Sequence, residues 1–310
     1  MKKVLITGGA GFIGSNVVQL LLRKNCKVRV LDNLSTGYKK NLNGLDVDFI
    51  LSDIRDKELV EQSCQGIDTI FHLAASVGRQ KSLDHSQEDS EVNLIGTTNI
   101  LEGARKTGVQ TIVYSSSAAI FGELQTLPIS EDHPQNPDSP YGVSKLAAEK
   151  QVLCFAGLYG FKAVCLRYFN VFGINQRYDA YGNVIPIFAE RLFSNRPVTI
   201  YGDGEQTRDF VNVQDVAMAN FLAATSSAKT DVYNIGSGSS ITINHLAKMM
   251  IKLSGVEGKI DYVPPRSADV RHCRANIDKA KEKISFSPTA DLEEGLASYL
   301  EWYKENEVFN

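Results

Sequence analysis

Residues 7–15 read TGGAGFIGS and directly follow the short apolar run VLI at residues 4–6. The stretch spaces Gly8, Gly11 and Gly14 three residues apart, after an expected strand and at the start of an expected helix. Glycines at such a turn allow a tight bend and a close approach of the backbone to a pyrophosphate. The first turn of the helix adds free N–H groups and the positive end of the helix dipole. The stretch therefore predicts a dinucleotide-binding turn, the alternative being a tight turn that binds nothing.

Two acidic residues at strand ends extend this prediction. Asp32 ends the apolar run at residues 28–31, where a carboxylate accepts hydrogen bonds from a ribose diol and repels a 2′-phosphate. Asp32 therefore favours NAD over NADP, while Lys39 and Lys40 nearby are cations that would favour NADP. Asp53 follows a later strand, and either it contacts an adenine edge or it caps the next helix.

The order of apolar segments predicts the fold class. Helical patterns separate most of the short apolar runs, which lie at residues 4–6, 28–31, 49–51, 70–73, 112–114 and 163–166. The helical patterns lie at residues 13–22, 92–104 and 146–158. Unbroken apolar strands separated by helices indicate a parallel sheet that is covered on both faces. We therefore expect an α/β fold with a doubly wound (Rossmann) parallel sheet.

The pattern changes after about residue 170, where segments shorten and loops become richer in Gly, Asn and Arg. We expect residues 1–170 to form the NAD-binding domain and residues 171–310 to form a smaller α/β lobe for the substrate. Residues 211–235 return to a strand and helix pattern, and we expect them to pack back on the first domain.

Composition limits the partners and the setting. Of 310 residues, 43% are apolar and 22% are charged, which is ordinary for a globular protein, and the net charge of −3 argues against nucleic acid or an anionic membrane surface. No apolar run approaches the ~20 residues of a membrane span. The five Cys residues contain no CxxC pair, so we expect no metal site and a reducing, cytoplasmic setting.

Residues 139–150, SPYGVSKLAAEK, read as the start of a helix. Ser139 is a plausible N-cap, and Pro140 fits a first turn because the N–H that it lacks would have no partner there. Tyr141 and Lys145 are four residues apart and thus share one helix face. The pair is either an ordinary amphipathic pair or a phenol whose pKa a neighbouring ammonium lowers.

With these features together, the chain resembles the extended short-chain dehydrogenase/reductase family, and within that family it most resembles the UDP-glucose (UDP-galactose) 4-epimerases. The resemblance covers essentially the whole chain. It rests on the motifs GGAGFIG (8–14), Asp32-Asn33, SSSAAIFG (115–122), YGVSK (141–145), LRYFNVFG (166–173), IYGDGEQTRDFV (200–211) and PPRSADVRHCRAN (264–276).

The resemblance implies a catalytic role for three residues. Tyr141 transfers the proton of the sugar 4-hydroxyl, Lys145 lowers the pKa of Tyr141, and Ser117 hydrogen-bonds the sugar oxygen. The implied reaction oxidises C4 of a UDP-hexose with NAD, turns the 4-keto sugar over and reduces its other face, so NAD is not consumed.

The resemblance also implies the binding residues. Those for NAD are Gly8, Gly11, Phe12, Ile13, Gly14, Asp32, Asn33, Ser35, Thr36, Gly37, Asp53, Ile54, Leu73, Ala74, Ala75, Asn93, Ser115, Tyr141, Lys145 and Tyr168. Those for the UDP-sugar are Ser117, Tyr141, Asn170, Thr199, Tyr201, Arg208, Arg266, Asp269 and Cys273.

Three positions narrow the reaction and the sugar. By resemblance, related dehydratases carry an Asp–Glu pair directly after the hydroxyl residue, and decarboxylating relatives carry a Glu there. This chain has Ala118 and Ala119 at these positions. Alanine is neither an acid nor a base, so the residues disfavour dehydration. By resemblance Cys273 lines the sugar pocket, where a small residue leaves space for a 2-acetamido group. We therefore expect UDP-N-acetylglucosamine to be accepted as well as UDP-glucose.

Alternatives remain open at this stage. Arg79, Lys81 and Arg177 flank segments that approach the substrate in the family, and a uronate carboxylate would suit such cations, so UDP-glucuronate 4-epimerase is the second candidate. A non-catalytic NAD(H)-sensing regulator is a candidate of a different class, although this chain keeps Tyr141 and Lys145. By resemblance we also expect a homodimer joined by a four-helix bundle from helices near residues 90–105 and 143–159.

Overall fold

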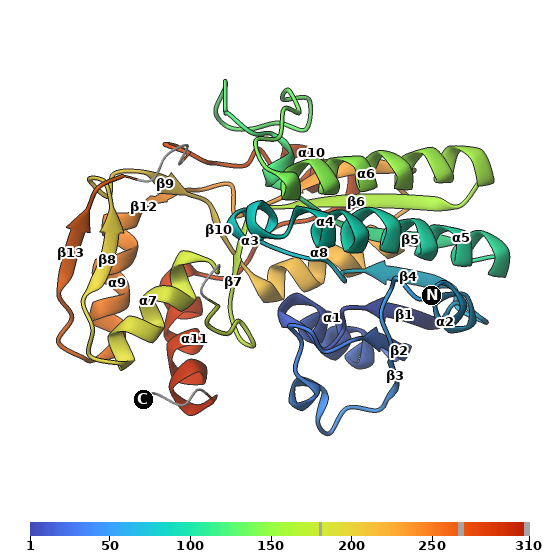
Figure 1. The fold of residues 1–310 in the computed structure, drawn as a ribbon, viewed down its shortest axis with the longest axis horizontal. Coiled ribbons are helices and arrows are strands. Elements are labelled where there is room, and N and C mark those ends of the chain that lie inside the picture. The colour runs from blue at the N-terminus through green and yellow to red at the C-terminus, as the bar shows by residue number, and fades with distance from the viewer. Residues whose placement is uncertain (180–181, 266–269, 307–310) are drawn as a thin grey trace.

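The computed structural model describes residues 1–179, 182–265 and 270–306. At its centre is a seven-stranded sheet in the order β11-β6-β5-β4-β1-β2-β3, in which every neighbouring pair is parallel (Figure 1). The strands are β1 (Lys3–Thr7), β2 (Lys27–Asp32), β3 (Val47–Leu51), β4 (Thr69–His72), β5 (Thr111–Ser117), β6 (Lys162–Tyr168) and β11 (Asp231–Ile235). The expected doubly wound sheet is confirmed. Its strand order reverses between β1 and β4, where sheets of this kind bind ligands at the carboxyl ends of the strands.

Helices cover both faces of the sheet. Along β1, Val4 and Ile6 pack into the apolar cluster that includes α1 (Phe12–Arg23), α8 (Val213–Thr225) and α10 (Asp278–Ile284). Leu5 between them faces the opposite cluster, because side chains alternate across a strand. That cluster draws on α2 (Lys57–Ser63), α5 (Thr97–Thr107) and α6 (Pro140–Tyr159).

A second, smaller lobe has its own apolar core. In Figure 1 it lies at the left, away from the large sheet. Its core joins α7 (Val184–Phe193), α9 (Ile243–Ser254) and α11 (Leu292–Asn306) to β8 (Val198–Tyr201), which pairs in parallel with β13 (Ile260–Val263). Two further small pairs are β7 (Asn170–Phe172) with β10 (Phe210–Asn212), and β9 (Thr207–Arg208) with β12 (Ile241–Thr242), the latter drawn beside the smaller lobe in Figure 1. Between residues 211 and 235 the chain returns to the large sheet, where α8 packs beside α1 and β11 pairs with β6.

Helix α6 begins as its sequence predicts. The Ser139 hydroxyl accepts a hydrogen bond from the Gly142 N–H at 3.3 Å, and Pro140 occupies the first turn. The helix ends at Gly160, whose φ of +78° is left-handed. These boundaries place Tyr141 in the first turn, beside the carboxyl end of β5.

The helix expected at residues 92–104 is two elements. A π-helical segment, η2 (Glu91–Gly96), connects the short helix α4 (Ser86–Ser90) to α5. Its Asn93 is buried and clamps the backbone of Ser76, donating to the carbonyl oxygen at 3.0 Å and accepting from the N–H at 2.8 Å. The wider turn accompanies this contact, and a sequence pattern of period 3.6 does not report it.

The remaining short elements connect these layers. They are η1 (Lys39–Leu42), α3 (Arg79–Asp84) and η3 (Ala118–Ile120). Within the described ranges, no helix is both long enough and apolar enough to span a membrane.

Gly14 tests the packing of the turn between β1 and α1, and Gly157 on α6 serves as its control. A Cβ at Gly14 would lie 2.0 Å from the Gly8 carbonyl oxygen, whereas a Cβ at Gly157 on the exposed side of α6 meets nothing within 4 Å. We expect Gly14→Ala to lower the free energy of unfolding by about 1–3 kcal/mol or more through overpacking. The matched Gly157→Ala should raise it by about 0.5–1 kcal/mol through helix propensity. Thermal and urea unfolding measure both, and equal effects of the two substitutions would contradict this packing.

Candidate active site

The turn between β1 and α1 has no space for side chains. Gly8 has a φ of +70°, and a Cβ on it would lie 2.8 Å from the backbone nitrogen of Ala74. Gly11 is the N-cap of α1 and makes no side-chain hydrogen bond. The capping residue therefore provides no acceptor for the first N–H groups of the helix, which belong to Phe12, Ile13 and Gly14. These N–H groups and the positive helix end form a site that suits a pyrophosphate.

Asp32 is held in place at the end of β2. Its side chain is buried, and its two oxygens accept hydrogen bonds from the backbone N–H groups of Ala10 at 2.9 Å and Leu34 at 2.8 Å. Burial raises the pKa of Asp32, while these two bonds lower it. A Cβ on Gly37 would lie 3.1 Å from the carboxylate, so a glycine there keeps its approach open. The residues present therefore fit a dinucleotide whose ribose lies beside Asp32.

Asp53 does not cap the next helix, which corrects one of the two expectations for it. Asp56 caps α2, its side chain accepting from the Leu59 N–H at 3.0 Å. Asp53 instead binds Arg55 at 2.8 Å and the side-chain amide of Asn33 at 2.7 Å. The Arg55 guanidinium lowers the pKa of Asp53 to about 2. The contact with Asn33 ties Asp53 to the turn after Asp32.

The two lysines near this turn contact aromatic rings. Lys39 Nζ lies 5.3 Å from the centre of the Phe49 ring, and Lys40 Nζ lies 5.8 Å from that of Tyr38. The aromatic contacts give both cations a role in packing the turn.

Tyr141 and Ser117 lie where β5 ends against α6, and Lys145 follows one turn later on α6. The Ser117 side chain acts on the Tyr141 hydroxyl and lowers its pKa, and Ser117 Oγ accepts from the Ala119 N–H at 3.1 Å. Lys145 is 2% exposed, and its Nζ lies 4.5 Å from the centre of the Tyr114 ring. The arrangement can move a proton between a bound hydroxyl and the Tyr141 phenol, with the buried Lys145 ammonium on the same helix.

Protein groups alone do not lower the pKa of Tyr141, contrary to what a nearby ammonium predicts. Burial raises the pKa of Tyr141 to about 12, and the hydrogen bond from Ser117 offsets only part of this rise. Burial also lowers the pKa of Lys145 to about 7. Lys145 lies over Tyr114 rather than against the phenol oxygen, so desolvation exceeds its attraction for a phenolate.

A buried chain of hydrogen bonds joins the glycine turn to η2. Thr97 Oγ1 donates to the Asn93 carbonyl at 2.6 Å, so it accepts from His72 Nε2 at 2.9 Å. His72 Nδ1 then accepts from the Thr7 hydroxyl at 2.7 Å. This order requires a neutral imidazole, and burial, followed by the charge of Lys145, lowers the pKa of His72 to about 3. The sequence pattern does not single out His72, because this residue lies within the apolar run at residues 70–73.

The other expected NAD residues surround the same edge. Thr7 Oγ1 accepts from the N–H groups of Leu73 and Ala74, each at 3.2 Å. Tyr168 exchanges hydrogen bonds with the Asn220 side chain on α8 at 2.8 and 3.0 Å, which occupies its hydroxyl. The rest lie in the turn after β2 (Asn33, Ser35, Thr36 and Gly37), after β3 (Ile54), after β4 (Ala75) and on β5 (Ser115).

The expected nucleotide-sugar residues lie on the smaller lobe and its connections. The Asn170 side chain donates to the Asp209 carbonyl at 3.0 Å. Thr199 and Tyr201 lie on β8, and Tyr201 is 37% exposed. Arg208 on β9 donates to the Thr207 carbonyl at 2.9 Å. Arg266 and Asp269 lie outside the described residues.

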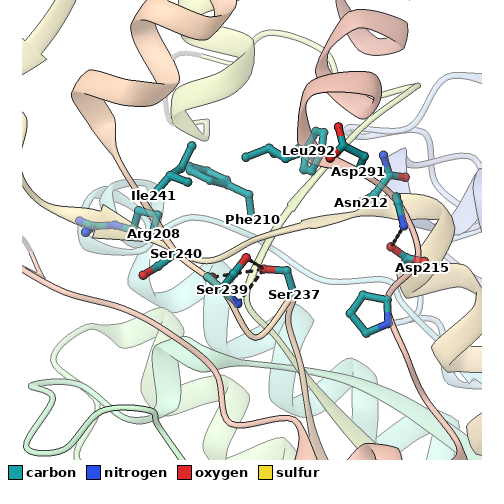
Figure 2. A pocket seen from close by; sticks show the side chains of 13 residues that line it. Arg208, Phe210, Asn212, Asp215, Ser237, Ser239, Ser240, Ile241, Asp291 and Leu292 are labelled. Atoms are coloured by element: carbon teal, nitrogen blue, oxygen red, sulfur yellow. Dashed lines mark hydrogen bonds between the residues drawn. The ribbon is translucent and has the colours of Figure 1, made fainter.

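A hollow of about 250 Å³ lies beside β9 and β10, with Arg208, Ser237 and Asp215 in its lining (Figure 2). In Figure 2 the guanidinium of Arg208 points away from Asp215. Tyr141 and Ser117 are not among the described residues that line it. The hollow is therefore distinct from the centre formed by Tyr141, Ser117 and Lys145.

Cys273 packs close to that centre. It is 9% exposed and belongs to an apolar cluster with Phe121 and Phe169, against which Ala118 packs. Burial raises the pKa of the Cys273 thiol to about 11. The thiol is thus a small neutral side chain in the cluster that also contacts the residue after Ser117.

The cations considered for a uronate have protein partners. Arg79 pairs with Asp138 at 3.3 Å. Arg177 lies 4.5 Å from the Tyr38 ring centre and 5.4 Å from that of Trp302, which places it between the dinucleotide side and α11. Lys81, on α3, acts on the buried carboxylate of Asp89. As to metals, no group of potential ligands is found in the described part of the chain.

Comparison with known proteins gives the family. Residues 4–236 match the model described as the NAD dependent epimerase/dehydratase family. A crystal structure of UDP-glucose 4-epimerase from Thermotoga maritima, with UDP-glucose, is 38% identical with a TM-score of 0.93, covering 98% of this chain and 99% of that one. UDP-N-acetylglucosamine 4-epimerase from Methanobrevibacter ruminantium, in complex with UDP-N-acetylmuramic acid, is 34% identical with a TM-score of 0.94 and 99% coverage of both chains. A UDP-glucuronate 4-epimerase of Thermodesulfobacterium geofontis is 33% identical over 99% of this chain and 97% of its own length.

The buried His72 predicts a pH dependence of stability. With a pKa of about 3 in the folded chain and ~6.5 when unfolded, only the unfolded state binds the proton as the pH falls below ~6.5. Between pH 7 and pH 5 this should cost about 2 kcal/mol of the free energy of unfolding. In urea unfolding, the His72→Asn variant should lose less free energy of unfolding between pH 7 and pH 5 than the unmodified protein, by that amount. The exposed His245→Asn should behave as the unmodified chain, and equal losses in all three proteins would contradict a neutral His72.

Proposed function

Because the chain belongs to the NAD dependent epimerase/dehydratase family, we propose that it interconverts the C4 epimers of a UDP-hexose. The substrates proposed are UDP-glucose and UDP-galactose, with UDP-N-acetylglucosamine and UDP-N-acetylgalactosamine accepted as well. The observation that carries the proposal is the Tyr141–Ser117 pair, with Lys145 buried behind it, at the carboxyl edge of the sheet that holds the glycine turn. In this proposal residues 1–170, with residues 211–235, bind NAD, and residues 171–310 bind the UDP-sugar.

The chain's own residues suit the binding of NAD. The N-terminus of α1 would hold the pyrophosphate, Asp32 would accept from the adenosine ribose, and the segment that follows β4 would line the nicotinamide side. When bound, NAD supplies an acceptor for the hydride of C4 and later a donor that returns it. Because oxidation and reduction cancel over the cycle, the reaction needs no added oxidant, and we infer that NAD stays bound.

Tyr141 is the proposed proton carrier. It takes the proton of the 4-hydroxyl as C4 is oxidised and returns it when the 4-keto sugar is reduced on its other face. The hydroxyl of Ser117 holds the sugar oxygen during both steps. Since burial alone raises the pKa of Tyr141 to about 12, a phenolate needs the charge of Lys145 together with the positive nicotinamide ring.

The residues after Ser117 favour epimerisation over elimination. Loss of water from the sugar needs an acid and a base beside the 4-keto intermediate. Ala118 and Ala119 occupy these places, and Ala118 packs into an apolar cluster. Neither can transfer a proton, which supports a reaction that ends when C4 is reduced again.

The UDP half would be held by the smaller lobe. We propose that Asn170 and Arg208 bind the diphosphate and that Thr199 and Tyr201 lie beside the uracil. Arg266 and Asp269 complete this set in the proposal, as a second guanidinium for the diphosphate and a carboxylate for the ribose. Guanidinium groups suit phosphate oxygens because their paired N–H groups match two oxygens.

Cys273 supports a pocket with space for a 2-acetamido group. Its thiol is small and belongs to the apolar cluster against which Ala118, the residue after Ser117, packs. UDP-glucuronate 4-epimerase remains the second candidate, supported by the relative of that name. It is the weaker one, because Arg79 pairs with Asp138 and Arg177 stacks between Tyr38 and Trp302. A regulator that only senses NAD(H) has no need for Tyr141, Ser117 and Lys145.

The substrate assay separates these candidates. The purified protein is incubated without added NAD with UDP-glucose, UDP-N-acetylglucosamine and UDP-glucuronate, and proton NMR reports the configuration at C4. We expect epimerisation of the first two, and Tyr141→Phe should lower kcat by about 10²–10⁴-fold through loss of the proton carrier. Turnover of UDP-glucuronate alone would replace the proposed substrate, and no turnover of any would overturn the proposed reaction.

Two variants of Cys273 isolate its effect on the sugar. Cys273→Tyr should lower kcat/KM for UDP-N-acetylglucosamine more than for UDP-glucose, because its bulk competes with the acetamido group. Cys273→Ala keeps the residue small and should leave the ratio of the two unchanged. Equal losses for both sugars in Cys273→Tyr would contradict a pocket role for Cys273.

The exposed apolar residues of η2 and α6 support a homodimer that forms a four-helix bundle. Ile95, Val143, Leu158 and Tyr159 are 53%, 53%, 68% and 49% exposed, and in Figure 1 α5 and α6 run along one side of the sheet. We expect light scattering to give the mass of two chains, and Val143→Glu to lower it. The mass of one chain at micromolar concentration would contradict the dimer.

The reduced cysteines favour a cytoplasmic setting.

A further inference from the structure

Asp89 is a buried carboxylate that the proposed reaction has not used. It lies on α4 with no exposed surface, and no Lys or Arg of the described residues forms an ion pair with it. Removing an unpaired charge from water is costly, so such a group needs hydrogen-bond donors. Ser144 Oγ donates to its Oδ2 at 2.5 Å, and Asn93 Nδ2 donates to its Oδ1 at 3.1 Å. Burial raises the pKa of Asp89, and these two donors, together with the charges of Lys145 and Lys81, oppose that rise and favour the ionised form.

These two donors lead to opposite sides of the candidate active site. Asn93 clamps the backbone of Ser76 on the segment after β4, which the proposal gives to the nicotinamide side. Ser144 directly precedes Lys145 on α6, and its Oγ lies 3.1 Å from the Tyr141 carbonyl oxygen. Asn93 Nδ2 also lies 3.0 Å from Ser144 Oγ, which closes the network, its two hydrogens being shared among three acceptors. Asp89 thus joins the segment after β4 to the helix that carries Tyr141 and Lys145.

The charge of Asp89 acts on both of those residues. It raises the pKa of Lys145 and also that of Tyr141. The other groups that face Lys145 are Cys165 and Glu149, which raise its pKa, together with His72, a neutral imidazole, and the Tyr114 ring.

Glu149 is neutralised by a close partner. Arg167 binds it from the neighbouring strand β6 at 2.7 Å, and both side chains are buried. Lys81 is the other cation that acts on Asp89, and Ser117 is the other group that acts on Tyr141. Asp89 is therefore the negative charge beside Lys145 that no ion pair in the described chain offsets.

We propose that Asp89 is a positioning residue for the epimerisation, which fixes α6 against the segment after β4 and whose negative charge keeps Lys145 an ammonium. The proposal rests on the proposed function, because it assigns Asp89 a role in the same proton transfer. It acts through Lys145 and Tyr141 and does not touch the sugar.

The test is the pH profile of kcat for UDP-glucose in the Asp89→Asn variant. The acid limb reports the loss of the Tyr141 proton and the alkaline limb the loss of the Lys145 proton. Because the carboxylate raises both pKa values, we expect both limbs to move to lower pH, by about 0.5–1 unit. The exposed Asp84→Asn on α3 removes a carboxylate from the same region and should move neither limb. Ser144→Ala removes a hydrogen bond but no charge, so it should lower kcat without moving the limbs.

The outcomes separate a charge effect from a structural one. Thermal unfolding and the NAD content of the purified variants, released by denaturation and read by absorbance, show whether each is folded and loaded. A folded Asp89→Asn with unmoved limbs overturns the proposal. If Asp89→Asn does not fold, Asp89→Ser is measured in the same way, and failure of both to fold assigns Asp89 to folding and overturns the proposal too. Absence of turnover in the unmodified protein is a failure of the proposed function and is recognised before any variant is made.

Discussion

The close contact between Gly8 and Ala74 is the constraint on which the rest of the structure depends. Gly8 at the end of β1 has a left-handed backbone, and a Cβ on it would lie 2.8 Å from the Ala74 nitrogen after β4. The two strands are neighbours at the point where the strand order reverses. Their connections can therefore meet backbone to backbone at the carboxyl edge of the sheet. This contact brings the N-terminus of α1 and the segment after β4 together at that edge, where sheets of this kind bind ligands.

Buried polar groups transmit that arrangement across the site. Thr7, His72, Thr97 and Asn93 form a continuous chain of hydrogen bonds from β1 to the π-helical segment η2. From Asn93 the chain continues to Asp89 and Ser144 on α6. Thr7, His72, Thr97, Asn93, Asp89 and Ser144 are all buried and hydrogen-bonded, so the network favours one relative placement of β1, β4, η2 and α6. Tyr141 and Lys145 thus occupy fixed positions relative to the glycine turn after β1.

Local sequence patterns predict the parts of this protein that depend on backbone geometry. The glycine spacing after residues 4–6, the Ser139 cap and the strand that ends at Asp32 all match the structure, because turns and caps need particular residues at particular places. The apolar runs likewise predict the parallel sheet. The resemblance to the epimerase family is confirmed by the match over residues 4–236.

What the sequence does not reveal are contacts between distant segments. Tyr141 and Lys145 share a helix face, yet Lys145 lies over Tyr114, which a helix pattern does not report. Asp53 pairs with Arg55 and Asn33, while Asp56, three residues later, caps the helix. Two carboxylates so close in sequence are distinguished only by the loop geometry.

In the proposed reaction, C4 is oxidised and reduced again within one site while the proton moves through Tyr141. The most direct measurement uses UDP-glucose carrying deuterium at C4, with no added NAD, and mass spectrometry of the UDP-galactose formed. We expect the product to retain the deuterium, because the hydride leaves C4 and returns to C4 without exchanging with water. UDP-galactose that has lost the label to solvent would contradict the proposed reaction, since it would require C4 to exchange its hydrogen as a proton.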